Sequence, residues 1–430
     1  MSIHDAIRHH EAGRFGEAER LYRSMLDVEP HHPDALHLLG VLLTQVGEYE
    51  DAVEKIQAAL DVNRDSALFQ SSLAQVYFRS GKLAEAIQML ERVVARQPGS
   101  FQAFSDLGAA LQESGELVRA IEAYRRSIEL NPDLAIVHFN LGTALKQQGG
   151  TADAIACVEK AVAMDAAQAS YAATLAGYYL EANEPAAALR SCRACLRVAP
   201  RNLMALTFLS IALDRLGDRE SAAEIVDFGR LIQHSRLAAP AGYESVSEFN
   251  DALTKYVRSH PTLRTDPLNN ATRYGKHTDN LLVNPSGPIP ALAELIDKAV
   301  ADYLQSLPTD PTHPYLAHRP SDFKCTMWSV VMDSQGHQLP HMHPDGWVSG
   351  VYYVALPGTM RAATGEQDGW IEFGRPLREL TGSLEPEVET IRPEEGMLVL
   401  FPSYFYHQTI PFESAEQRIS IAFDAVPQFR

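Results

Sequence analysis

A period of 34 residues runs through the first half of the chain and limits what this half can fold into. Small turn-forming residues recur at this spacing, at Gly13, Gly47, Gly81, Gly115, Gly149, Asn183 and Gly217. An alanine lies five residues after each of them, at Ala18, Ala52, Ala86, Ala120, Ala154, Ala188 and Ala222. A third series has the same phase and consists of Pro30, Pro98, Pro132 and Pro200. Repeats of this length predict similar units that stack on their neighbours.

Each series has a physical reason. Glycine and asparagine tolerate the left-handed backbone that ends a helix, and alanine lets two helices approach closely. Proline begins the next repeat, where its missing N–H leaves nothing unpaired. Residues 2–230 therefore resemble the tetratricopeptide repeat family. The resemblance implies helix-turn-helix units in a right-handed superhelix, with a concave groove that holds a peptide or a partner protein.

The composition narrows the classes of function. The chain has 37 basic and 55 acidic residues and a net charge of −18, which disfavours a nucleic-acid-binding surface and docking on anionic lipid. It has no apolar run of the roughly 18 residues that a membrane span needs, and its first residues lack the features of a signal peptide. Its four cysteines are too few for a disulfide framework. We expect a cytoplasmic protein with neither nucleic acid nor membrane as a partner.

The 34-residue phase ends near residue 230, and a different pattern follows. Residues 231–320 combine two helical patterns, at 246–257 and 291–307, with proline-rich turns. The second helix is long enough to lie across a β domain as a support. We therefore predict three parts: a repeat superhelix at 2–230, a helical connector at 231–320, and a β domain at 321–430.

The third part is rich in β-branched and aromatic residues separated by turns. The strands predicted there are 323–332, 338–343, 347–356, 370–373, 388–391, 397–401, 405–410 and 418–426. Short strands without intervening helices fit a double-stranded β-helix, or jelly roll, and exclude a doubly wound parallel sheet. The predicted fold is thus an α-solenoid followed by a jelly roll. Trp328, Trp347 and Trp370 are expected in its core.

Polar residues on these strands predict a metal site. His341, His343 and Asp345 are two residues apart, so on a strand they point to one face. A non-haem Fe(II) site takes two histidines and one carboxylate on one triangular face and leaves the other positions open. His343, Asp345 and the distant His407 meet this requirement.

An arginine about ten residues beyond the distal histidine predicts that the site also binds an anionic co-substrate. Arg418 lies one strand further on, with Ser420 on the same face. A guanidinium there is suited to clamp a dicarboxylate co-substrate through a bidentate ion pair, and Ser420 adds a hydrogen bond.

Together these residues resemble the Fe(II)- and 2-oxoglutarate-dependent oxygenases, in particular a bacterial and phage group akin to prolyl hydroxylases. The resemblance covers residues 320–427, including the Ser-Gly-Val-Tyr-Tyr strand at 349–353 and the Leu-Phe-Pro-Ser run at 400–403. It implies iron at His343, Asp345 and His407, 2-oxoglutarate at Arg418, Ser420 and Tyr353, and no catalytic residue beyond the metal ligands.

The first two metal ligands have an alternative assignment. The group often carries a His-x-His-Pro pattern, in which His341 and His343 would be the ligands and Asp345 would lie on a turn. We favour His343 and Asp345, since a carboxylate completes the usual triad.

The sequence thus predicts an Fe(II)- and 2-oxoglutarate-dependent dioxygenase that hydroxylates a protein or peptide recruited by the repeat array. The alternative is a repeat scaffold whose jelly roll has lost turnover. A metal-dependent enzyme of the same fold without a keto acid has no use for the Arg418 clamp. Phosphate-binding loops, the dinucleotide-binding glycine turn and the serine-hydrolase elbow are all missing from the sequence.

Overall fold

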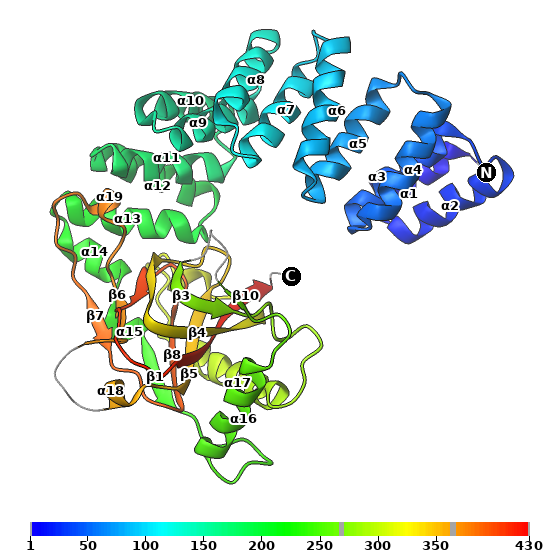
Figure 1. Ribbon diagram of the computed structural model, residues 1–430. Helices are drawn as coiled ribbons and strands as arrows, with labels where there is room; N and C mark the ends of the chain where they lie inside the picture. Colours follow the sequence, from blue (N-terminus) through cyan, green and yellow to red (C-terminus); the bar gives the residue numbers. More distant parts are fainter. Residues whose placement is uncertain (1, 266–270, 362–366, 429–430) are drawn as a thin grey trace. The chain divides into compact units, whose positions relative to one another are not determined.

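The structure, a computed structural model, describes residues 2–265, 271–361 and 367–428. It divides into two compact units, residues 1–166 and 167–430, which are blue to teal and green to red in Figure 1. The repeat array is shared between them, because the first unit ends after α10 and the second begins just before α11. Among the described residues no helix is both long and apolar enough to cross a membrane.

The first unit is built of paired antiparallel helices, one pair for each repeat (Figure 1). These are α1 (Ile3–Glu11), α2 (Phe15–Val28), α3 (Pro33–Val46), α4 (Tyr49–Val62), α5 (Ala67–Arg79), α6 (Leu83–Arg96), α7 (Phe101–Glu113), α8 (Leu117–Leu130), α9 (Ala135–Gln147) and α10 (Thr151–Met164). The predicted turn glycines all have positive φ, for example 86° at Gly47, and the repeated alanines are fully buried. The repeated prolines lie in the turn before each first helix rather than within it.

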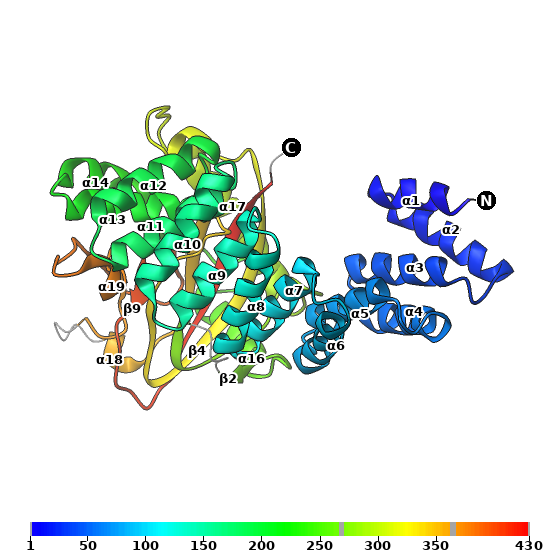
Figure 2. The ribbon, with the colours of Figure 1, turned by 90° about the horizontal axis from the view of Figure 1, so that it is seen from above.

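The second unit continues the array and adds the connector and β-domain helices. Its helices are α11 (Ala169–Glu181), α12 (Pro185–Val198), α13 (Leu203–Arg215), α14 (Arg219–Ile225), α15 (Phe228–Leu231), α16 (Val246–Arg258), α17 (Ile289–Ser306), α18 (Gly358–Arg361) and α19 (Arg378–Thr381), with a 3-10 turn η1 (Leu316–His318). The helices predicted at 246–257 and 291–307 are confirmed as α16 and α17. Helix α19, inserted between two strands, packs against α11 and α13 (Figure 2).

The strands form one strongly curled, antiparallel sheet. They are β1 (Gln233–Arg236), β2 (Arg264–Thr265), β3 (Thr272–His277), β4 (Asp322–His341), β5 (Val348–Ala355), β6 (Ile371–Phe373), β7 (Glu389–Ile391), β8 (Met397–Pro402), β9 (His407–Thr409) and β10 (Arg418–Gln428). The main path runs β1-β8-β5-β10-β4-β9-β6-β7, and β2 and β3 join beside β4. This arrangement confirms the predicted jelly-roll class.

Strand β4 closes the curl, because its first half pairs with β10 and its second half with β9. Two strands were predicted over this stretch, and one irregular strand is found. Gln335 lies at the irregularity with a left-handed φ of 65°. The connector also contributes β1, β2 and β3, which the sequence did not predict.

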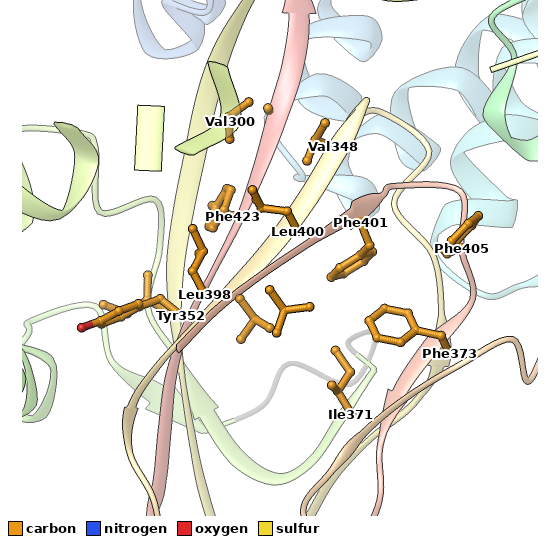
Figure 3. Close-up of a cluster of buried hydrophobic side chains, with 14 of the residues drawn as sticks. Val300, Val348, Tyr352, Ile371, Phe373, Leu398, Leu400, Phe401, Phe405 and Phe423 are labelled. Atoms are coloured by element: carbon orange, nitrogen blue, oxygen red, sulfur yellow. The ribbon is translucent and has the colours of Figure 1, made fainter. Parts of the chain in front are cut away.

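One hydrophobic core spans the second unit. It includes Leu206 of α13, Val300 of α17 and Phe423 of β10. Figure 3 shows part of this core, where Phe373 meets Phe401 edge-on with ring centroids 4.8 Å apart. The last repeat helices therefore help to hold the sheet in place. The domain borders predicted at residues 230 and 320 remain predictions.

Candidate metal centre

Three histidines from two distant parts of the chain converge in the curl. His341, His343 and His407 each offer a ring nitrogen, and these nitrogens all lie within 4.8 Å of one another. The ring centroids of His341 and His407 are 4.2 Å apart, and each lies 5.2 Å from that of His343. No other cluster of at least three such ligand groups was found among the described residues.

Sheet topology explains this convergence. His341 ends β4 and is the register partner of His407 at the start of β9. His343 lies just past the strand, where its backbone N–H donates to the Ser403 carbonyl at 2.9 Å. Thus the closure of β4 on β9 brings together side chains that are far apart in sequence.

Hydrogen bonds assign the tautomer of each ring. The Nδ1 of His341 lies 2.8 Å from the Leu339 carbonyl, and that of His407 lies 3.0 Å from the Phe405 carbonyl. The Nδ1 of His343 lies 2.7 Å from a carboxylate oxygen of Asp424. Since a carbonyl or carboxylate oxygen only accepts, each Nδ1 carries the proton. Nε2 is therefore the nitrogen of each ring that is left to bind a metal.

Burial favours the neutral form of His341 and His407. It lowers the pKa of His341 to about 4, and the neighbouring His343 adds to the effect. Burial also lowers the pKa of His407 well below its usual value, again with help from neighbouring histidines. Both imidazoles are neutral at pH 7, as metal ligation requires.

Asp345 does not join the cluster. Its side chain is exposed on a bend, and it is not among the residues whose ligand atoms converge. The strand ends at His341 and Pro344 follows, so strict alternation no longer governs where Asp345 points. The structure thus groups the histidines of the alternative assignment.

Arg418 is a buried cation without an anion. It is only 2% exposed, and its Nη1 lies 3.3 Å from the Ser420 hydroxyl and 3.7 Å from the sulfur of Met332. Its guanidinium carbon lies 5.1 Å from the ring centroid of Tyr353. Among the described residues, the Nε of Arg418 and the hydroxyl of Tyr353 are both buried without a hydrogen-bond partner.

Such a group is costly unless something pairs with it, because a buried charge loses its hydration. No carboxylate in the described part of the chain forms an ion pair with Arg418. Burial lowers the pKa of Arg418, and it raises that of Tyr353 against the opposing effect of the guanidinium. The predicted trio of Arg418, Ser420 and Tyr353 is brought together around this unpaired charge.

A cavity of about 580 Å³ opens onto two of the three histidines. Its lining includes His341, His343, Gln338 and Trp328, with Arg264 beside it. Trp328 stacks over His343 at 5.7 Å between ring centroids, so it lines the cavity as well as touching the core. Trp347, by contrast, is buried in the core as predicted.

Asp424 is a site residue that sequence reasoning missed. Its contact with His343 spans 81 residues, and nothing local marks it. A signal was present in the strand period: Asp424 lies an even number of residues after Arg418 and Ser420, hence on the same face of β10.

Comparison with known proteins agrees with the architecture. Residues 326–424 match the family described as "Putative 2OG-Fe(II) oxygenase". Tetratricopeptide repeat families match residues 9–76, 71–135 and 123–156. Residues 326–424 thus match this oxygenase family and residues 9–156 match tetratricopeptide repeats, in the order that the sequence predicted.

Solved structures resemble the chain only in part. MamA from Desulfovibrio magneticus RS-1 is 24% identical, with 38% of this chain and 93% of that chain covered and a TM-score of 0.36. Pseudomonas aeruginosa pilF is 22% identical, with 46% and 90% covered and a TM-score of 0.42. At these TM-scores neither likeness bears on function. No curated protein matches the chain significantly.

Proposed function

We propose that this protein is an Fe(II)- and 2-oxoglutarate-dependent oxygenase that holds its metal with His341, His343 and His407. The observation that carries the proposal is the buried, unpaired guanidinium of Arg418. It lies on the same face of β10 as Asp424, which contacts the histidine cluster.

The donor set fits iron. Three neutral imidazole nitrogens suit a first-row metal such as Fe(II), and they leave coordination positions for other ligands. Neutral imidazole ligands leave a bound metal its full charge of +2, which favours an anionic chelating co-substrate. Iron, when bound, supplies the activation of O₂ that lets 2-oxoglutarate be oxidised together with a C–H bond of the substrate.

The protein's own residues would hold and orient 2-oxoglutarate. Its distal carboxylate matches the guanidinium fork of Arg418, and the hydroxyls of Ser420 and Tyr353 stand ready to donate. In this buried setting the ion pair is much stronger than in water, and it removes the cost of the unpaired cation.

The repeats indicate the class of substrate. Arrays of this kind present extended surfaces that bind polypeptides, so we propose a protein or peptide substrate recruited by the array. The cavity of about 580 Å³ offers room beside the histidines for the residue to be oxidised. The cytoplasmic location stays a prediction.

Anaerobic calorimetry tests this proposal. 2-Oxoglutarate is titrated into the full chain loaded with Fe(II), alongside Arg418→Ala and His407→Ala. We expect binding that requires iron and is lost in both variants. Wild-type protein that binds no 2-oxoglutarate would refute the oxygenase and leave a repeat scaffold as the function.

A further inference from the structure

The histidine cluster lacks the carboxylate of the usual facial triad, but a carboxylate lies directly behind it. Asp424 accepts a hydrogen bond from Nδ1 of His343, with its two oxygens at 2.7 and 2.8 Å from that nitrogen. Since Nδ1 is engaged by Asp424, Nε2 is the ring nitrogen that is left to bind a metal. Asp424 is thus placed to act on the metal through His343 rather than by direct coordination.

Asp424 is held firmly in this place. The Ser349 hydroxyl is 2.6 Å from one of its oxygens and 2.9 Å from the Ser403 hydroxyl. Both serines are buried, and Ser349 is the register partner of Asp424 on β5. A side chain at Gly346 would approach within 2.7 Å of the Ser403 hydroxyl and 3.2 Å of Cβ of Asp424. The glycine therefore permits the close packing that orients the carboxylate.

Among the described residues, no lysine or arginine pairs with the charge of Asp424. Its side chain is only 15% exposed, and its ion-pair contact is with the titratable ring of His343. A partly buried carboxylate still gains from a nearby positive charge, and a divalent metal on the far side of His343 would supply it. Conversely, a carboxylate behind a ligating histidine raises the basicity of the ring and fixes its orientation.

We propose that Asp424 is a positioning residue that fixes the Nδ1-protonated form of His343 and supplies, through that ring, the negative charge that the three-histidine site lacks. This inference rests on the proposed metal site. It also distinguishes two carboxylates near His343: the exposed Asp345, two residues away in sequence, and the partly buried Asp424, 81 residues away.

Fe(II) affinity of the full chain, measured anaerobically by competition with a chromophoric chelator, tests the proposal. We expect Asp424→Asn to weaken binding about 10- to 100-fold, which is the usual effect of losing such a partner. The matched control Asp345→Asn should leave the affinity unchanged. In metal-free protein, ¹⁵N shifts of the His343 ring should show protonation at Nδ1 in the wild type and a shift toward Nε2 protonation in Asp424→Asn.

The outcomes separate this inference from the proposed function. An unchanged affinity and tautomer in Asp424→Asn would overturn the inference alone, as would a loss confined to Asp345→Asn. Wild-type protein that binds no Fe(II) would overturn both proposals. If Asp424→Asn does not fold, Ser349→Ala replaces it, because it frees the carboxylate without removing its charge. A several-fold loss is expected there, and an unchanged affinity would overturn the inference.

Discussion

Replacing Arg418 with methionine should cost the protein its co-substrate but not its stability. Methionine is similarly long and apolar, and the pocket already contains the sulfur of Met332 at 3.7 Å from the guanidinium. Breaking a typical buried ion pair destabilises a protein by about 3–5 kcal/mol because a charge is left unpaired. Here the charge is unpaired before the mutation. The variant removes it, along with a 3.3 Å contact to the Ser420 hydroxyl and the stacking on Tyr353.

The expected magnitudes follow from these contacts. Stacking of a cation on an aromatic ring contributes up to about 2 kcal/mol when desolvated, whereas the desolvation of the charge costs several kcal/mol. The ligand-free free energy of unfolding of Arg418→Met should therefore stay within about 1 kcal/mol of wild type or exceed it. In wild type, 2-oxoglutarate at 100 times its Kd should add about 2.7 kcal/mol. Loss of the guanidinium should weaken 2-oxoglutarate binding by about 2–5 kcal/mol and so abolish most of this gain.

Calorimetric melting of Fe(II)-loaded protein, with and without 2-oxoglutarate and without oxygen, measures both effects. Each 1 kcal/mol should move the melting temperature of a unit of this size by about 2–4 °C. Arg236→Met, which changes an exposed arginine on β1, is the matched control and should keep the full ligand-induced shift. The reasoning is refuted if ligand-free Arg418→Met melts far below wild type, or if it retains the shift.

Two further predictions concern packing and pH. Leu206→Ala in repeat helix α13 should lower the stability of the metal-binding unit by about 2–5 kcal/mol, because Leu206 is fully buried in the shared core. Leu43 in the first unit is equally buried, but Leu43→Ala should leave the retention of Fe(II) in urea unchanged. If both variants lost Fe(II) at the same lowered urea concentration, the prediction would be wrong. Burial lowers the pKa of His277 from 6.5 to about 4, so the unfolded chain takes up this proton first as the pH falls. The free energy of unfolding, measured in urea, should therefore decline between pH 6.5 and 4, and it should decline less steeply in His277→Gln. If the wild type and His277→Gln declined equally steeply, His277 would not contribute to the pH dependence.

The sequence predicted the features that repeat or that have a local pattern. Seven turn residues in phase predicted the left-handed positions, including Asn183 with a φ of 63°. Helices α16 and α17 followed from their periodicity. Strands β1 and β2 are too short, at four and two residues, to show alternation above background. They exist because neighbouring strands offer them a sheet edge, which is tertiary information.

In the candidate metal centre, too, local patterns were predicted and features that depend on tertiary contacts were not. The types of residue and the order of His341, His343, His407 and Arg418 along the chain predicted the chemistry, because strand closure brings such positions together. Whether Asp345 lies near His343 and His407 depends on where β4 ends, which residue alternation alone does not tell. The strand period of β10 placed Asp424 on the face of Arg418, but its contact with His343 depends on the pairing of β10 with β5 and spans 81 residues, so the sequence did not reveal its role.

Turnover of 2-oxoglutarate without any added substrate tests the central claim most directly. The full chain is incubated with Fe(II), 2-oxoglutarate and O₂, and succinate is quantified against Arg418→Met and an anaerobic control. The account predicts succinate that depends on iron, oxygen and Arg418. 2-Oxoglutarate that binds in an iron-dependent manner but yields no succinate would contradict it, and would show a binding protein built on an oxygenase fold.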